Sequence, residues 1–318
     1  MEPLHSKSLH GQKVLVTGGG FIGARVVGRA LAYGARVSVL VRPGGNRSRL
    51  APFDVQTYEG DILDEAAVTR ALGEERPDVV VHAAGMVDSR REPSLTAAMV
   101  RLHALGTTHV LEAARLAGVA RVVVLGSSGE YGNAAEQFDE DRLAAPVDPY
   151  SASKLAATAI TLTYDRAFGL PCTVVRPFVV YGPGEAKTRI FSTVFAQALA
   201  GGGEVAFTAG EQVRDFVYAD DVADGIFRAA LAPEARGRIL NLGTGIGIRV
   251  RDAITMAIAV SQNRVIPRFG DLPYRPGEPP SLVSDNRRIE SVLGWSPTTS
   301  LAEGVALTYA ACVEAWGT

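Results

Sequence analysis

The feature that most constrains this chain is a short apolar segment that runs into a glycine-rich turn and then into a helical segment. Residues 13–17 read as a strand and residues 21–33 as a helix. Between and after them, Gly18, Gly20 and Gly23 follow the spacing G-x-G-x-x-G. In that spacing the first glycine permits a tight turn, the second lets a pyrophosphate approach the backbone, and the third lets helix and strand pack closely. The segment therefore predicts the first strand–helix unit of a dinucleotide-binding sheet.

The rest of the first half alternates strands with helices. Val79-Val80-Val81 and Val122-Val123-Val124-Leu125 are nearly unbroken apolar runs, which is the pattern of strands covered on both faces. This alternation predicts an α/β fold with a doubly wound parallel sheet of the Rossmann type. The expected strands are 13–17, 36–41, 79–82, 121–126 and 172–176, and the expected helices are 21–33, 65–72, 95–117 and 150–168.

After about Phe178 the chain is punctuated by glycine and proline, for example at Gly182-Pro183-Gly184 and Gly201-Gly202-Gly203. Helices are expected at 219–231, 249–259 and 285–293. We expect residues 11–177 to form the nucleotide-binding domain, with 215–243 returning to it. Residues 178–214 and 244–318 would then form a smaller, interleaved C-terminal lobe that binds the substrate.

Composition excludes several classes of protein. The 318 residues carry a net charge of −2, so no basic excess suggests a nucleic-acid partner. Cys172 and Cys312 form neither a metal-ligand spacing nor a disulfide framework, which fits a cytoplasmic protein without a bound metal. No signal peptide or membrane-spanning run is visible, so no membrane association is expected.

The cofactor is predicted from the turn and from the second strand. The amino end of the first helix, at Phe21 and Ile22, offers N–H groups to a phosphate. An NAD site usually has a carboxylate at the end of the second strand, where this chain has Val41 followed by Arg42. A guanidinium can pair with a 2′-phosphate, so NADP(H) is predicted and NAD is disfavoured. The alternative is that Arg42 is only a solvated loop residue.

Further candidate contacts with the cofactor follow the other strands. Asp61 could cap the next helix or receive the adenine amino group, and both roles remain open. The small residues after His82 would let a flat cofactor lie against the backbone, whereas His82 itself is expected to be a packed histidine. The remaining candidates at strand ends are Ile62, Ala83, Ala84, Gly85 and Pro177.

The strongest catalytic signal is Tyr150-Ser-Ala-Ser-Lys154. On a helix, Tyr150 and Lys154 lie one turn apart on the same face. An ammonium beside a phenol favours the phenolate, so we expect Lys154 to lower the pKa of Tyr150. Such a pair occurs by chance on many helices. Its position after the glycine turn, with Ser127-Ser128 at a strand end between them, makes the signal strong.

Together these residues resemble the extended short-chain dehydrogenase/reductases, the NAD(P)-dependent epimerase/dehydratase group that acts on nucleotide-sugars. The resemblance runs from Val14 to about Gly304. Beyond the turn and the Tyr150–Lys154 pair, the matching segments are Gly60-Asp61, His82-Ala83-Ala84, Ser127-Ser128, Tyr131-Gly132, Arg176-Pro177, Tyr181-Gly182-Pro183, Arg214-Asp215-Phe216-Val217-Tyr218, Asp220-Asp221-Val222-Ala223, Asn241-Leu242-Gly243-Thr244-Gly245, Arg275-Pro276-Gly277 and Leu293-Gly294-Trp295-Ser296-Pro297.

The resemblance implies roles for individual residues. Ser127 would hydrogen-bond the substrate oxygen, Tyr150 would exchange a proton with it, and Lys154 would hold the nicotinamide ribose. Arg214 and Arg275 match positions that grip the pyrophosphate of a nucleotide-diphosphate sugar. The family often dimerises through the helix that bears the Tyr-Lys pair and the long helix before it, so a homodimer is expected.

Departures from the family pattern reduce the number of candidate reactions. Sugar 4,6-dehydratases carry an Asp and a Glu where this chain has Ser128 and Gly129, so dehydration has no evident catalyst. The stretch from Gly126 to Gly132 looks most like reductases of nucleotide-linked 4-keto-6-deoxysugars. Val179 replaces an asparagine that binds substrate phosphate in many members, and His103 replaces a common asparagine on the long helix. The glycine turn is one residue shorter than usual.

The first functional hypothesis is therefore an NADPH-dependent 4-ketoreductase of a nucleotide-activated deoxysugar. The second is a nucleotide-sugar 4-epimerase with tightly held NAD, which Val41-Arg42 argues against. A reductase of a non-sugar ketone is kept open by Val179 but opposed by Arg214 and Arg275. A non-enzymatic NADP-sensing regulator is a hypothesis from another class. It is disfavoured because such proteins typically lose the Tyr-Lys pair.

Overall fold

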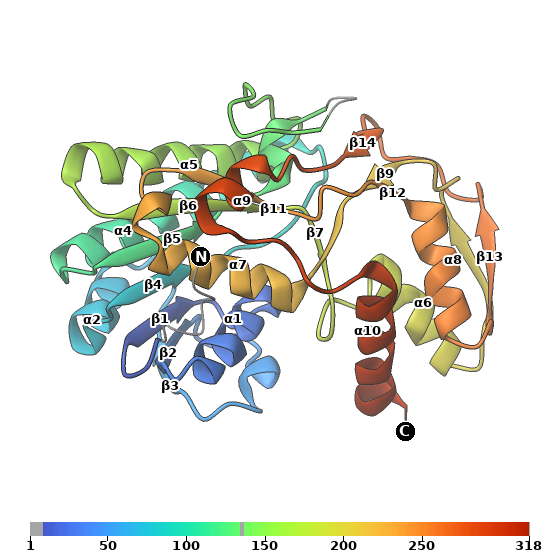
Figure 1. The fold of residues 1–318 in the computed structure, drawn as a ribbon, viewed down its shortest axis with the longest axis horizontal. Helices are drawn as coiled ribbons and strands as arrows, with labels where there is room; N and C mark the ends of the chain where they lie inside the picture. Colours follow the sequence, from blue (N-terminus) through green and yellow to red (C-terminus); the bar gives the residue numbers. More distant parts are fainter. Residues whose placement is uncertain (1–8, 134–136, 318) are drawn as a thin grey trace.

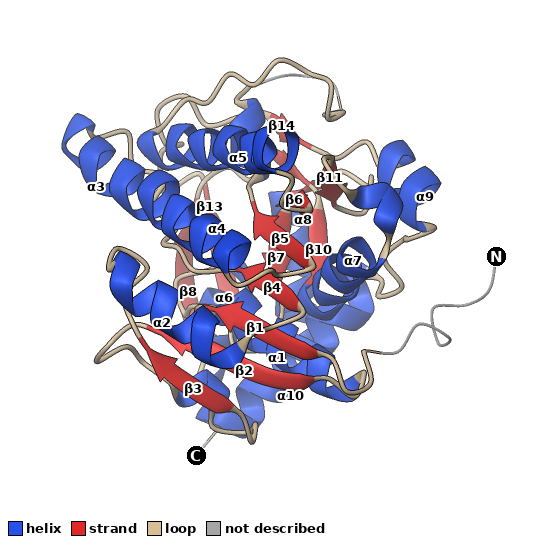
Figure 2. Cartoon of the chain, turned by 90° about the vertical axis from the view of Figure 1, so that its left-hand side faces the viewer, coloured by secondary structure: helices blue, strands red, loops and turns tan. Residues whose placement is uncertain are grey.

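The structure is a computed structural model that describes residues 9–133 and 137–317. Its larger lobe is built on strands β1 (Lys13–Thr17), β2 (Arg36–Val41), β3 (Gln56–Glu59), β4 (Val79–His82), β5 (Arg121–Leu125), β6 (Cys172–Pro177) and β11 (Ile239–Leu242). Within the described residues these seven strands form one parallel sheet in the order β11-β6-β5-β4-β1-β2-β3 (Figure 2). The predicted fold class is confirmed. The strand order reverses between β1 and β4, where doubly wound sheets bind ligands beyond the carboxyl ends of their strands.

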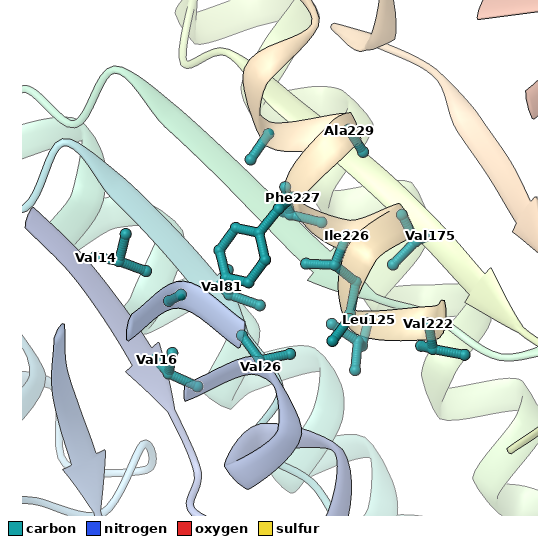
Figure 3. Packing of buried hydrophobic residues seen from close by; sticks show 14 of the residues in the cluster. Val14, Val16, Val26, Val81, Leu125, Val175, Val222, Ile226, Phe227 and Ala229 are labelled. Atoms are coloured by element: carbon teal, nitrogen blue, oxygen red, sulfur yellow. The ribbon is translucent and has the colours of Figure 1, made fainter. Parts of the chain in front are cut away.

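Both faces of this sheet are covered because successive side chains of a strand alternate between the faces. In β1, Val14 and Val16 pack in a cluster with α1 (Phe21–Ala32) and α7 (Ala219–Leu231), as Figure 3 shows for part of that cluster. Leu15, between them, packs on the opposite face. Because Leu15 is fully buried, its replacement by alanine should cost about 2–5 kcal/mol of stability.

The opposite face is covered by several helices, which lie to the upper left of the sheet in Figure 2. They are α2 (Glu65–Glu75), α4 (Gly106–Leu116) and α5 (Pro149–Phe168), and α3 (Thr96–Val100) packs on α5. We expected one continuous helix over 95–117. The structure instead inserts a π-helical turn, Arg101–Leu105, between α3 and α4. Val100 and Gly106, on either side of the π turn, have ordinary helical dihedral angles. The spacing of apolar residues in the sequence did not reveal this interruption.

A second lobe lies beside the first and has its own core (Figure 1). In it, α6 (Ile190–Leu199), α8 (Val250–Val260) and α10 (Leu301–Trp316) pack around buried apolar side chains, including Phe191, Phe195, Ile254 and Val305. The strand β8 (Gly203–Phe207) pairs with β13 (Val265–Phe269), and β9 (Val213–Arg214) lies between β12 (Ile248–Arg249) and β14 (Ser281–Leu282).

The chain passes between the lobes through short extended segments. After Phe178, β7 (Val179–Tyr181) leaves the sheet and pairs in parallel with β10 (Phe216–Tyr218), which leads directly into α7. The strand that follows, β11, then pairs with β6, and α9 (Arg287–Leu293) packs nearby. Thus the segment between residues 215 and 243 gives both a helix and a strand to the larger lobe. The domain boundaries inferred from sequence stay predictions.

Candidate functional site

Most of the predicted cofactor-binding and catalytic residues follow strand ends at the carboxyl edge of the seven-stranded sheet. The turn beginning at Gly18 follows β1, Arg42 follows β2, Ala83 follows β4, and Pro177 ends β6. Because all seven strands are parallel, these ends lie at one edge, which is where ligands of such sheets bind.

The glycine turn has the geometry that a dinucleotide requires. Gly18 has a φ of +87°, and a Cβ there would lie 2.8 Å from the Ala84 Cα. A Cβ on Gly23 would collide with the Gly18 carbonyl oxygen, whereas a Cβ on Gly20 would meet no atom within 4 Å. Gly20 is also the N-cap of α1 and offers no side-chain cap. The first N–H groups of α1, at Phe21 and Ile22, therefore have no side-chain cap and are available to a pyrophosphate.

The arginines near the end of β2 have different surroundings. Arg47 forms an ion pair with Glu59, which stands opposite Val41 in the register of β2 and β3. Arg49 donates to the carbonyl oxygen of Gly184 at 2.8 Å. Arg42 is exposed, and among the described residues no hydrogen bond or ion pair engages its side chain. Of the three, Arg42 has the side chain that a ligand anion could engage without breaking another contact.

Asp61 does not cap the following helix. Asp64 caps α2 by accepting the N–H of Ala67 at 3.1 Å, while Asp61 accepts the N–H of Leu63 at 2.9 Å. Asp61 thus closes the turn that precedes the cap, because it lies three residues too early to reach the first free N–H groups of α2. Ile62 is buried against Gly106 in the core, so its contact with a cofactor would be through the backbone.

The small residues after β4 are tightly confined. A Cβ on Gly85 would lie 3.0 Å from His103 Nε2 and 3.6 Å from Lys154 Nζ. Just before them, the His82 ring is hydrogen-bonded on both nitrogens, to Thr17 at 2.6 Å and Thr107 at 3.0 Å. Burial, with a smaller effect of Lys154, lowers the pKa of His82 to about 3, so it is a neutral packing residue, as expected.

The Tyr-Lys pair lies on the first turns of α5. This helix begins at Pro149, and the side chain of Asp148 caps it by accepting the N–H of Ser151 at 2.8 Å. Lys154 is buried one turn after Tyr150, and its Nζ donates to the carbonyl oxygen of Leu125 at 2.8 Å. The lysine is therefore anchored to the end of β5, two residues before Ser127.

The expected effect of Lys154 on Tyr150 is not what the structure shows. Burial raises the pKa of Tyr150 to about 12, although the nearby Ser127 hydroxyl lowers it. Burial also lowers the pKa of Lys154 to about 8. Burial is the largest cause of both shifts because it disfavours each charged form, and Lys154 is not among the groups that shift the pKa of Tyr150. At neutral pH Tyr150 is thus a phenol rather than a phenolate.

Ser127 sits in a rigid turn. Its side chain accepts the N–H of Gly129 at 3.1 Å, and its own N–H donates to Glu130 Oε1 at 2.8 Å. The other carboxylate oxygen of Glu130 accepts from Arg176 Nη2 at 2.7 Å, and both side chains are almost fully buried. Both carboxylate oxygens of Glu130 are therefore engaged in structural hydrogen bonds. Ser128 is also buried, and its hydroxyl is not an acid that could replace a carboxyl group.

The two candidate phosphate-binding arginines meet at one carboxylate. Arg214 Nη2 lies 2.8 Å from Glu278 Oε1, and Arg275 Nε lies 3.3 Å from Glu278 Oε2. Arg275 also donates to Ser89 in the other lobe at 2.8 Å. Val179, the remaining candidate, begins β7 and is partly buried against the core of the second lobe.

Sequence reasoning missed Glu278, Glu130 and the contacts of His103. Glu278 follows Arg275 by three residues, a spacing that could have suggested an ion pair. The partners of Glu130 and His103 lie far away in sequence, so only the fold shows them. In the described part of the chain there is no cluster of three or more His, Cys, Asp or Glu side chains that could hold a metal ion. Helices that could cross a membrane are likewise absent from residues 9–133 and 137–317.

The chain is similar in sequence and in fold to enzymes that act on nucleotide-sugars. The chain is 35% identical over 310 residues to a UDP-glucose 4-epimerase of Mycolicibacterium smegmatis, covering 93% of this chain and 97% of the relative. It is 32% identical to a dTDP-glucose 4,6-dehydratase of Xanthomonas campestris pv. campestris, covering 92% and 91%. The crystal structure of the Thermus thermophilus UDP-glucose 4-epimerase in complex with NAD matches with a TM-score of 0.84 and 30% identity, covering 94% of this chain and 98% of that one.

A family model also matches residues 14–243, which include the glycine turn, Ser127 and the Tyr150–Lys154 pair. With its parallel sheet, its dinucleotide-binding turn and these relatives, the chain belongs to the NAD dependent epimerase/dehydratase family.

Proposed function

We propose that this enzyme uses NADPH to reduce the 4-keto group of a nucleotide-activated hexose, with a 6-deoxyhexose as the preferred sugar. The observation that carries the proposal is the placement of Tyr150 near Ser127 at the carboxyl edge of the sheet, with Lys154 one turn later on the same helix and anchored to the end of β5. Reduction of a ketone needs a proton donor, and a tyrosine whose pKa is about 12 holds its proton at neutral pH.

In the proposed reaction, Tyr150 gives its proton to the carbonyl oxygen as that oxygen becomes an alkoxide. The Ser127 hydroxyl donates a hydrogen bond to the same oxygen and stabilises the developing charge. The ammonium of Lys154 stabilises the phenolate that remains, until solvent returns a proton to it. When bound, the reduced nicotinamide supplies the hydride to carbon 4. The product is the 4-hydroxy sugar.

NADP(H) is preferred in this proposal because Arg42 is available for the 2′-phosphate and Val41 offers no carboxylate to the ribose. The only carboxylate in register with Val41 among the described residues is that of Glu59, which is paired with Arg47. Gly18, Gly20 and Gly23 would hold the pyrophosphate with the first N–H groups of α1.

The substrate is proposed to be a nucleotide-diphosphate sugar. Arg214 and Arg275 would bind its two phosphates, since guanidinium groups pair well with phosphate oxygens. Dehydration is not proposed, because Ser128 and Gly129 provide neither acid nor base and Glu130 is engaged by Arg176. Val179 would contribute an apolar contact near the start of β7.

A second candidate is a nucleotide-sugar 4-epimerase, favoured by the 35% identity with the mycobacterial UDP-glucose 4-epimerase. That reaction starts by removing a proton from the sugar hydroxyl. It therefore needs the phenolate form of Tyr150, which the raised pKa opposes in the ligand-free chain. An epimerase also gains from holding the oxidised cofactor between turnovers.

One experiment separates the two. The purified protein is first denatured, and any released nicotinamide cofactor is identified and counted. The native protein is then incubated with NADPH and nucleotide-linked 4-keto-6-deoxyhexoses, and separately with UDP-glucose without added cofactor. Loss of NADPH absorbance with one product hydroxyl formed per NADPH supports the reductase. Conversion of UDP-glucose to its 4-epimer, with retained NAD, would replace this proposal with the epimerase.

Two further expectations remain proposals. A homodimer through α4 and α5 would cover side chains that are exposed in the single chain, among them Leu105, Leu116 and Phe168. Sedimentation of the purified protein tests this. Cytoplasmic location is inferred from cysteine usage and is testable by fractionation.

A further inference from the structure

We propose that His103 is a positioning residue that ties the cofactor-lining loop after β4 to the helix of Tyr150. The inference rests on the proposed function, in that Tyr150 is taken as the proton donor and residues 83–86 as the cofactor wall.

The position of His103 is unusual. It lies in the π-helical turn Arg101–Leu105 and is 1% exposed. A π turn shifts the register of side chains relative to a regular helix, and such turns are frequent at functional sites. The π turn packs against α5, and the His103 ring meets the Tyr150 ring edge-on, with centroids 5.4 Å apart.

Two hydrogen bonds define what the ring does. The backbone N–H of Met86 donates to His103 Nε2 at 3.2 Å, and His103 Nδ1 lies 2.7 Å from Ser153 Oγ. Ser153 in turn donates to the backbone carbonyl of Tyr150 at 2.7 Å. Since Nε2 accepts, the proton of the neutral ring is on Nδ1, and it points to Ser153.

Each hydrogen bond in this series is therefore donated in the same direction. The bonds lead from Met86 N–H through His103 and Ser153 to the carbonyl of Tyr150. A protonated imidazole could not accept from Met86, so the link requires a neutral ring. Burial, followed by the effect of the Lys154 charge, lowers the pKa of His103 to about 3 and keeps the ring neutral.

The loop end of the link is equally confined. Gly85 leaves only enough room for His103 and Lys154, since a Cβ there would touch both side chains. Displacement of His103 would thus release the loop on one side and Tyr150 on the other. The position of Tyr150 relative to residues 83–86 would then no longer be fixed by hydrogen bonds through His103.

The inference predicts a split between binding and turnover. His103→Leu removes both hydrogen bonds and leaves the Met86 N–H without its acceptor, so the cofactor Kd should rise and kcat should fall, each by about tenfold. Ser153→Ala cuts only the Tyr150 side, so kcat should fall about fivefold while the cofactor Kd stays within about twofold. His103→Gln keeps one acceptor and one donor and should retain both parameters within about threefold.

The measurements are fluorescence titration with whichever nicotinamide cofactor the wild-type protein binds, and turnover of a nucleotide-linked 4-keto-6-deoxyhexose. Thr161→Val is the matched control. Thr161 is a buried residue farther along the same helix, where its hydroxyl donates to the Ala157 carbonyl and not to the Tyr150 turn. This variant should leave the Kd and kcat within about twofold. A circular dichroism melt of each variant accompanies the assays.

Unchanged cofactor affinity and turnover in a folded His103→Leu protein would overturn the inference. So would equal losses in Kd and kcat for Ser153→Ala, or a His103→Gln protein as impaired as His103→Leu. If the wild type turns over no nucleotide-sugar, the proposed function fails. The cofactor titration then still decides the inference, because unchanged binding by His103→Leu refutes it and weakened binding supports it.

Discussion

The catalytic edge of the sheet and the arginine pair of the second lobe differ in whether a buried charged group has a partner of opposite charge. At the edge, Tyr150 and Lys154 each lie where burial opposes their charge. In the second lobe, burial also lowers the pKa of Arg214, but Glu278 opposes that effect and shares its carboxylate between Arg214 and Arg275.

This difference predicts what must change in each region when a ligand binds. The catalytic edge is preorganised, because Ser127 and Lys154 are already held by the end of β5 and its turn. The arginines are charge-compensated, so a diphosphate must exchange places with Glu278. The first region should therefore govern turnover and the second should govern affinity. Four of the five predictions below test this division, and the prediction for Arg42 tests the choice of cofactor.

The largest effect is expected for Tyr150→Phe, which removes only the hydroxyl. Turnover should fall by about a hundred- to ten-thousandfold, because general acid catalysis contributes on that order. NADPH binding should change little. Single-turnover NADPH oxidation and cofactor titration measure the two quantities. Near-normal turnover would show that the proton comes from another group.

Arg214→Ala should weaken nucleoside diphosphate binding by about a hundredfold while kcat at saturation is retained. The reason is that Arg214 is buried, so its bond to phosphate is little screened by water. Arg275→Ala is the matched comparison. Because the Arg275 side chain is 68% exposed, its loss should cost several times less. Calorimetry with UDP and dTDP measures both, and equal losses would contradict the argument from burial.

Arg42→Ala should erase most of the preference for NADP(H) over NAD(H). One or two charge-assisted hydrogen bonds to the 2′-phosphate should make that preference about ten- to a hundredfold. Dissociation constants of both cofactors are compared in the wild type and the variant. Equal constants in the unmutated protein would refute the assignment of Arg42.

Activity should decline on the alkaline side because of Lys154. Its pKa is lowered to about 8, so the ammonium is present below that pH and is lost above it. The pKa of Tyr150, at about 12, keeps the phenol protonated throughout this range. The rate should therefore fall by about tenfold for each pH unit above 8. A pH profile of kcat/KM that stays flat up to pH 10 would contradict this role.

The smallest effect is expected for Glu278→Gln, which removes the shared negative charge but keeps the shape. The affinity for UDP or dTDP should rise by about three- to tenfold, because the competing carboxylate is gone. Titration at two salt concentrations checks that the gain is electrostatic. Weaker binding would mean that Glu278 orients the arginines instead of competing for them.

Much of the larger lobe could be predicted from the sequence. The strands β1, β2 and β4 have the predicted bounds, since each is an apolar run next to a clear turn signal. The strand β3, Gln56–Glu59, was missed because it is short, polar and at the sheet edge. In the second lobe α6 and α10 were missed, although the apolar residues that α6 buries, Phe191, Val194, Phe195 and Ala198, follow a helical spacing.

The candidate site divides in the same way. The Tyr150–Lys154 spacing and the glycine turn are local patterns, so their positions follow from sequence. Burial is not local, and it reversed the expected effect on the pKa of Tyr150. The pairing of Arg214 with Glu278 joins residues of separate strands and loops, which a single sequence does not bring together.

The place of β11 has a consequence for synthesis of the protein on the ribosome. The edge of β6 is completed only after the chain has made α6, β10 and α7 and has returned to the sheet. Until then, the nascent larger lobe exposes an unpaired strand edge and lacks α7, one of the helices that cover one face. A ribosome-bound chain that ends shortly after β6 should therefore recruit chaperones or associate with other chains. One that extends past β11 should fold and resist proteolysis.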